Sequence, residues 1–124
     1  MWELSKSFQF EAAHRLSGTS LGVVSEEIHG HSFRAEIAVR GTPDRDRGMI
    51  VDLGALEQQI ALVRATLDHK YLNDVEALGT PTLENLARFI FDRVRNCGSV
   101  SRVTVFRDSR GEACTYFGDT APRD

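Results

Sequence analysis

Three of the four histidines in this 124-residue chain are spaced so that they could bind one metal ion. His29 and His31 are two residues apart, so on a β-strand both side chains project from the same face of the sheet. His14 ends another segment with strand-like alternation and could complete the site from a neighbouring strand. Three neutral imidazoles suit Zn²⁺ and leave its fourth position open for water or substrate, as in catalytic zinc sites. The alternative is three ordinary histidines satisfied by hydrogen bonds.

The fourth histidine, His69, directly follows Asp68 at the expected end of a helix. A carboxylate that hydrogen-bonds an imidazole fixes its tautomer, and the ring can then transfer a proton near neutral pH. A solvated helix terminus would contain the same two residues. Both interpretations stay open at this point.

Two predicted strands must position the three clustered histidines. Residues 8–14 and 29–40 alternate between apolar and polar side chains, and the histidines share the apolar face of each segment. Asp52 is a candidate N-cap for a helix that ends near Asp68, and a second helix follows Pro81. Two further strands are expected at 100–106 and 114–117, around a turn at 108–111.

This order, ββααββ, predicts a single α+β domain over residues 1–124, with a four-stranded antiparallel sheet and two helices on one face. The open edges of such a sheet invite pairing between subunits, so we expect a homo-oligomer. The charge balance, 15 Lys and Arg against 18 Asp and Glu, argues against a nucleic-acid partner. No apolar run approaches the roughly 20 residues that cross a membrane, and no secretory signal begins the chain. We therefore expect a soluble, cytoplasmic protein with both cysteines reduced.

Five segments, in order, resemble the 6-pyruvoyltetrahydropterin synthase and 6-carboxytetrahydropterin synthase family. The resemblance covers about residues 4–117 and is strongest to bacterial 6-carboxytetrahydropterin synthases of the queuosine pathway. It implies the tunnelling fold, in which subunits join their sheets into a barrel, commonly a hexamer. The matching segments are FEAAHRL (10–16), IHGHSF (28–33), GMIVDL (48–53), LDHKYLND (67–74) and PTLENLA (81–87).

The same resemblance implies roles for individual residues. His14, His29 and His31 would bind zinc, while Asp68 and His69 would belong to the catalytic Cys-Asp-His group of the family. The implied reaction is that of a lyase on a reduced pterin such as 7,8-dihydroneopterin triphosphate, with loss of triphosphate or cleavage of a carbon–carbon bond.

One departure from the family concerns its catalytic cysteine, whose position is occupied by Ser25. A serine hydroxyl is a far weaker acid than a thiol and is a poor proton-abstracting base. Glu26 or Glu27 could replace it, as in a branch of the family that uses Glu at the cysteine position and resembles an aldolase, although here the carboxylates are shifted by one or two residues. The alternatives are an exposed acidic loop, a laboratory Cys-to-Ser substitution, or a paralogue with another substrate.

A second departure concerns the acidic residue that anchors the pterin in the family. Depending on the alignment, its position is occupied by Arg107 or by Asp108. An arginine would favour a carboxylate or phosphate, whereas an aspartate could accept the N–H donors of a pterin or simply belong to a turn. Thr82 and Glu84 match the family near its substrate pocket and equally fit a helix cap and first turn.

Three functions are consistent with these residues. The first is a zinc-dependent lyase acting on a reduced pterin. The second is a divergent aldolase or cyclase acting on dihydroneopterin or a non-pterin substrate. The third is a zinc-holding binding protein with little catalysis, which would not need the Asp68–His69 pair.

Overall fold

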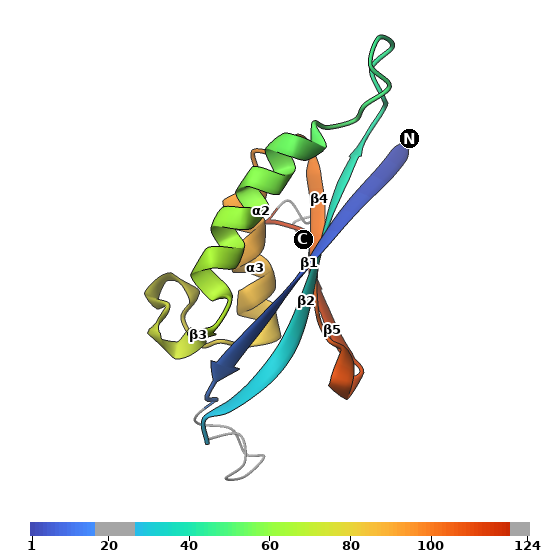
Figure 1. Ribbon diagram of the computed structural model, residues 1–124. Helices are drawn as coiled ribbons and strands as arrows, with labels where there is room; N and C mark the ends of the chain where they lie inside the picture. Colours follow the sequence, from blue (N-terminus) through green and yellow to red (C-terminus); the bar gives the residue numbers. More distant parts are fainter. Residues whose placement is uncertain (17–26, 120–124) are drawn as a thin grey trace.

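The fold is a five-stranded sheet with both long helices packed on one of its faces (Figure 1). The computed structural model describes residues 1–16 and 27–119. The strand order is β3-β1-β2-β4-β5. This confirms the predicted α+β class and corrects the predicted four-stranded antiparallel sheet. The additional strand, β3 (Lys70–Tyr71), pairs parallel with β1 and is too short to show any alternation in the sequence.

Strands β1 (Trp2–His14) and β2 (His29–Gly41) are the longest elements, with 13 residues each. They pair antiparallel, and the register places His14 opposite His29 and Ala12 opposite His31. Strand β1 begins six residues before the predicted strand. The alternation is weak in residues 2–7 because they contain few large apolar side chains, so the sequence pattern marks the strand only from residue 8. The pairing brings the three histidines to one end of the hairpin.

Strands β4 (Val100–Arg107) and β5 (Glu112–Tyr116) form a second antiparallel pair. The 3-10 turn η3 (Asp108–Arg110) joins them, followed by Gly111 in the left-handed region with φ of 66°. Glycine adopts this conformation without steric cost, which explains its place in the turn. The register sets Arg107 directly opposite Glu112.

The two helices begin at the N-caps expected from the sequence. Asp52 precedes α2 (Leu53–Leu67) and accepts a hydrogen bond from the Gly54 N–H at 2.9 Å. Thr82 precedes α3 (Leu83–Val94) and accepts one from the Asn85 N–H at 3.1 Å. Two short 3-10 segments, η1 (Leu72–Asp74) and η2 (Glu76–Leu78), connect the helices.

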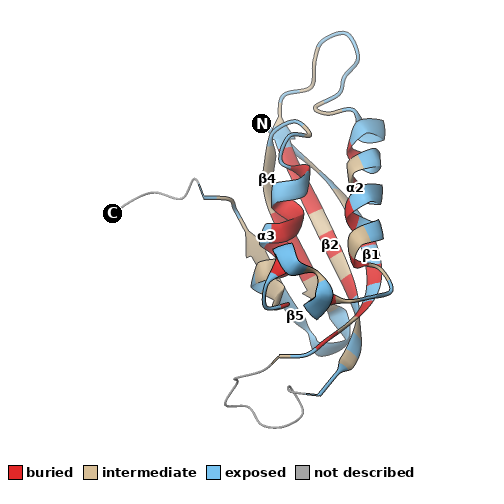
Figure 2. Ribbon diagram, turned by 90° about the vertical axis from the view of Figure 1, so that its left-hand side faces the viewer, coloured by how far each residue is buried: buried red, intermediate tan, exposed pale blue. Residues whose placement is uncertain are grey.

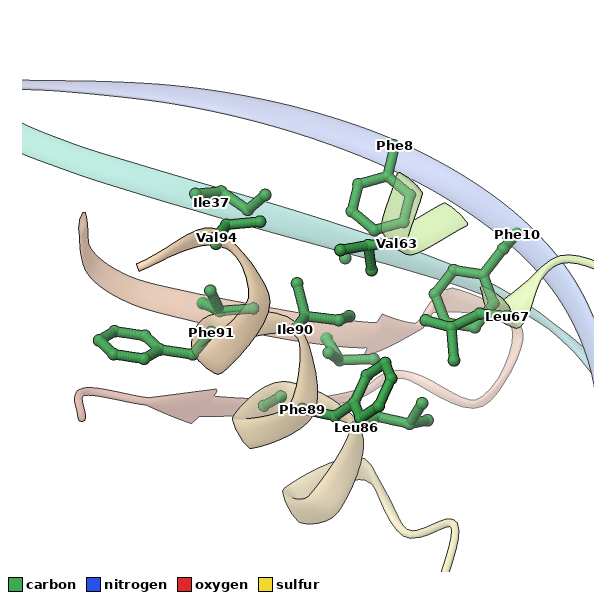
Figure 3. Packing of buried hydrophobic residues seen from close by; sticks show 14 of the residues in the cluster. Phe8, Phe10, Ile37, Val63, Leu67, Leu86, Phe89, Ile90, Phe91 and Val94 are labelled. Atoms are coloured by element: carbon green, nitrogen blue, oxygen red, sulfur yellow. The ribbon is translucent and has the colours of Figure 1, made fainter. Parts of the chain in front are cut away.

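The hydrophobic core lies between the helices and the sheet face that they cover (Figure 2). Side chains from β1 and α3 point toward one another across this layer (Figure 3). Phe10 and Phe33, both 1% exposed, stack with ring centroids 5.0 Å apart. The opposite sheet face is polar, and there Arg102 pairs with Glu3 at 2.7 Å and Glu36 at 2.8 Å. Across the described ranges, the helices are all too short or too polar to cross a membrane.

Candidate metal centre and adjacent cavities

The three predicted metal ligands meet at the end of the β1–β2 hairpin. His14 is the last residue of β1, and His29 and His31 lie on β2. One ring nitrogen from each lies within 4.8 Å of the others. The ring centroids are separated by 4.6, 5.0 and 4.8 Å, and the planes are close to perpendicular. The geometry therefore groups the three imidazoles around a common point.

Hydrogen bonds orient two of these rings. His14 Nδ1 donates to the Pro81 carbonyl at 3.0 Å, and His29 Nδ1 donates to the Glu27 carbonyl at 2.8 Å. Because a carbonyl can only accept, the ring proton is on Nδ1 and each Nε2 carries a lone pair. The two Nε2 atoms are 3.0 Å apart. Two lone pairs this close repel one another unless a cation lies between them.

The remaining ligand atom also fits a metal site. His31 Nε2 is buried and has no hydrogen-bond partner within residues 1–16 and 27–119. Nitrogen ligands on a tetrahedral zinc with bonds of 2.0–2.1 Å lie about 3.3 Å apart, close to the separation of the two other Nε2 atoms. The unpartnered Nε2 of His31 and the two facing Nε2 atoms of His14 and His29 therefore form a donor set suitable for Zn²⁺.

Burial favours the neutral forms of His14 and His31. It is the main cause that lowers the pKa of His14, and it lowers the pKa of His31 from 6.5 to about 4. The neighbouring histidines and the positive charge of Arg107 act in the same direction on both rings. Neutral imidazole is the form that binds metal ions, so protons compete weakly for these nitrogens.

The metal-free protein should lose stability as the pH falls. Between pH 6.5 and pH 4 the unfolded chain protonates His31 while the folded chain does not, so the free energy of unfolding decreases toward acid. After allowance for solvent screening, we expect a loss on the order of 2 kcal/mol over this interval. Urea denaturation at a series of pH values should show a smaller loss for His31→Gln and an unchanged one for His69→Gln, whose ring is 79% exposed. An equal decrease of the free energy of unfolding with pH in all three proteins would contradict the assignment of this loss to His31.

Asp68 and His69 lie against β1 at Glu11. Asp68 Oδ1 accepts the Glu11 N–H at 2.9 Å, and Arg64 Nη2 lies 3.0 Å from Oδ2. The Glu11 N–H is the main cause that lowers the pKa of Asp68, followed by the charge of Arg64. His69 Nε2 is 3.6 Å from Oδ2, beyond hydrogen-bond distance. The predicted Asp–His hydrogen bond is therefore not formed in this chain.

His69 itself has an unusual backbone. Its φ of 59° is the one positive value of a non-glycine residue in the described part of the chain. The His69 N–H donates to the Glu11 carbonyl at 2.7 Å, which holds this conformation. Strained residues of this kind are concentrated at functional sites. His69 and His31 line the same open depression of about 530 Å³, together with Lys70 and Tyr71.

A second cavity, of about 390 Å³, gathers three other predicted site residues: Thr82, Glu84 and Arg107. The connection to the triad runs through Pro81, since its carbonyl binds His14 and its neighbour Thr82 lines the cavity.

Asp108 lies outside this cavity. It is exposed and forms a two-pronged ion pair with Arg34 at 3.0 and 3.2 Å.

Sequence reasoning missed Glu112 and Cys114, which also line the cavity. The signal for Glu112 was the hairpin register, which sets it opposite Arg107. Burial and the charge of Glu84 raise the pKa of the Cys114 thiol, so it remains protonated.

The region of the catalytic-cysteine position is described only in part. Ser25 and Glu26 lie outside the described residues. Glu27 is exposed, and its backbone carbonyl, rather than its carboxylate, contacts the triad through His29. The proposed role of a neighbouring carboxylate as base thus stays a prediction.

The chain thus combines a two-helix α+β fold with three histidines, at the end of its central hairpin, that could hold a metal ion. The family model "6-pyruvoyl tetrahydropterin synthase" matches residues 3–119, and the chain belongs to this family. A Synechocystis 6-carboxy-5,6,7,8-tetrahydropterin synthase is 38% identical over 103 residues, covering 79% of this chain and 78% of the relative.

Two further relatives bear on fold and reaction. A Pyrococcus furiosus dihydroneopterin monophosphate aldolase is 35% identical over 86 residues, covering 69% of this chain and 68% of the relative. The structure of Caenorhabditis elegans 6-pyruvoyl tetrahydropterin synthase superposes with a TM-score of 0.79 at 26% identity, over 95% of this chain and 96% of that one. The family therefore includes relatives named for different reactions.

Proposed function

We propose that this protein is a zinc-dependent lyase acting on a reduced pterin, such as 7,8-dihydroneopterin triphosphate. The observation that carries the proposal is the group formed by His14, His29 and His31, whose ligand atoms lie within 4.8 Å of one another in a chain of this family. The name of the Synechocystis relative favours a 6-carboxytetrahydropterin synthase reaction. A binding protein without catalysis would need no strained, exposed histidine next to this group.

Zn²⁺ held by the triad would supply a Lewis acid that polarises an oxygen of the pterin side chain. In the proposed mechanism, His69 transfers a proton at Nε2 from the depression that it shares with His31. Asp68 stays ionised because its pKa is lowered, and its carboxylate lies 3.6 Å from His69 Nε2. Thr82 and Glu84 line the cavity in which the rest of the substrate would lie.

A second candidate is an aldolase that cleaves the side chain of a dihydroneopterin. It is favoured by the Pyrococcus furiosus relative, which is named for this type of reaction, and by Ser25 at the cysteine position. A serine hydroxyl cannot supply a thiolate at neutral pH, so a different base would be required. Glu26 and Glu27 are the carboxylates nearest in sequence.

Product analysis by mass spectrometry distinguishes these reactions. The zinc-loaded protein is incubated separately with 7,8-dihydroneopterin triphosphate, its monophosphate and 7,8-dihydroneopterin. We expect a 6-carboxy or 6-pyruvoyl product from the triphosphate, whereas a 6-hydroxymethyl product would establish the aldolase. If every substrate remains unchanged, Ser25→Cys serves as the second arm: a large gain in turnover shows a pterin site that lacks its base, and no gain excludes a pterin lyase.

We also propose that the chain forms a homo-oligomer. The support is the exposed outer edges of β3 and β5, together with a sheet face that no helix covers. Pairing of these edges between subunits would bury backbone groups that are otherwise left to water.

A further inference from the structure

Arg107 is a cation that the fold buries at the end of β4. Its side chain is 15% exposed and continues the face of Val103 and Val105, which are both fully buried in the core. The removal of a guanidinium from water is costly unless its donors find acceptors. The position of Arg107 in the sheet therefore requires acceptors nearby.

The described residues meet this requirement only in part. Arg107 Nη2 lies 2.6 Å from Glu112 Oε1, while its Nε is buried with no hydrogen-bond partner within the ranges 1–16 and 27–119. A guanidinium has five N–H donors in a planar fork that matches carboxylate and phosphate oxygens. Arg110 Nε lies 3.9 Å from the same Glu112 oxygen. One carboxylate, 43% exposed, is thus shared by two guanidinium groups.

The cavity contains charges of both signs. Arg107 is largely buried, whereas its ion-pair partner Glu112 and Glu84 are exposed. The cavity also adjoins the triad, because His14 donates to the carbonyl of Pro81, the residue before Thr82 in the lining, and the charge of Arg107 contributes to the lowered pKa values of His14 and His31. A ligand in this cavity would meet a positive charge next to the metal ligands.

We propose that Arg107 determines substrate specificity by binding an anionic oxygen group of the substrate, a carboxylate or a phosphate, in the cavity next to His14. This inference rests on the proposed function for the rest of the substrate. It adds that the pterin must carry an acidic group on the part that enters this cavity. Charge-assisted hydrogen bonds to a buried guanidinium are worth about a 10- to 100-fold gain in affinity.

The test compares oxidised pterins, which cannot undergo the proposed reaction because that reaction requires a reduced ring. Binding of neopterin, neopterin triphosphate and 6-carboxypterin to the zinc-loaded protein is followed by pterin fluorescence. We expect at least one acidic ligand to bind about tenfold or more tightly than neopterin. A preference for the triphosphate alone identifies a phosphate subsite, and a preference for 6-carboxypterin alone identifies a carboxylate subsite.

Variants test whether Arg107 causes the preference for an acidic pterin over neopterin. Arg107→Gln should remove the preference and leave neopterin affinity within about twofold. Arg110→Gln is the matched control, since Arg110 is near the same Glu112 but does not line the cavity, and it should keep the preference. Arg107→Lys retains the charge without the planar fork and should retain only part of it. Zinc content and thermal unfolding verify that each variant is folded.

The outcomes separate this inference from the proposed function. No preference in the unmodified protein, or a preference that survives Arg107→Gln in a folded variant, overturns the inference. If no pterin binds at all, the proposed function fails. Calorimetric titration with inorganic phosphate then tests separately whether Arg107 forms an anion site. Saturable phosphate binding that Arg107→Gln abolishes supports the anion site, whereas binding that survives in Arg107→Gln, or no binding, contradicts it.

Discussion

Replacement of His29 by alanine is expected to abolish zinc binding and lower turnover about a thousandfold, because it leaves two protein ligands where a catalytic zinc site needs three. His29 is partly exposed at the first position of β2, so its loss should not unfold the sheet. Zinc content by plasma mass spectrometry and initial rates on the active pterin give the two readouts.

His69→Ala is the matched control for this variant. It removes an imidazole from the depression that His31 lines but not from the triad, so the protein should keep its zinc while turnover falls. The molar mass from light scattering should be unchanged in both variants. An oligomer that dissociates only in His29→Ala would mean that the metal has a structural role, and full zinc occupancy in His29→Ala would rule out the triad as the site.

Replacement of Phe33 by alanine should destabilise the fold by about 3–5 kcal/mol and also weaken zinc binding. Phe33 is 1% exposed, and its ring packs edge-on against the rings of His14 and His31 at centroid distances of 5.9 and 5.7 Å. The cavity left by the side chain would remove the packing that orients two ligands. Denaturant unfolding and a competitive zinc titration measure the two effects.

Phe89→Ala provides the comparison, because Phe89 is 6% exposed on α3 and lies in the same core, whereas the aromatic ring that packs against the triad in the described residues is that of Phe33. It should show a comparable loss of stability with unchanged zinc affinity. If both variants lower zinc affinity equally, the effect reflects general loosening of the fold and not support of the ligands by Phe33.

The elements that could be predicted are those with strong local signals. Asp52 and Thr82 have the side chains that cap helices, and the structure confirms both caps. The face shared by His14, His29 and His31 followed from alternation alone, because the period of a strand decides which side chains are neighbours. The two-residue strand β3 could not be predicted, since its pairing depends on where the chain meets β1.

Site details that depend on distant contacts were also beyond sequence reasoning. Asp68 Oδ1 accepts the Glu11 N–H, 57 residues away in the chain, and Oδ2 lies closer to Arg64 than to His69. The pair formed by Arg107 and Glu112 required the register of the last hairpin. Local patterns identify chemical groups, whereas tertiary contacts decide which groups those residues face.

The location of the metal ligands on the core face sets up a trade-off in evolution. His14 is 1% exposed and continues the row of Phe8, Phe10 and Ala12, so an apolar residue there would extend the core. In the absence of metal, the buried polar ring is less favourable than a well-packed hydrocarbon side chain. Laboratory selection for thermal resistance without added zinc should therefore enrich apolar replacements at His14, and a more robust protein would be obtained at the expense of its chemistry.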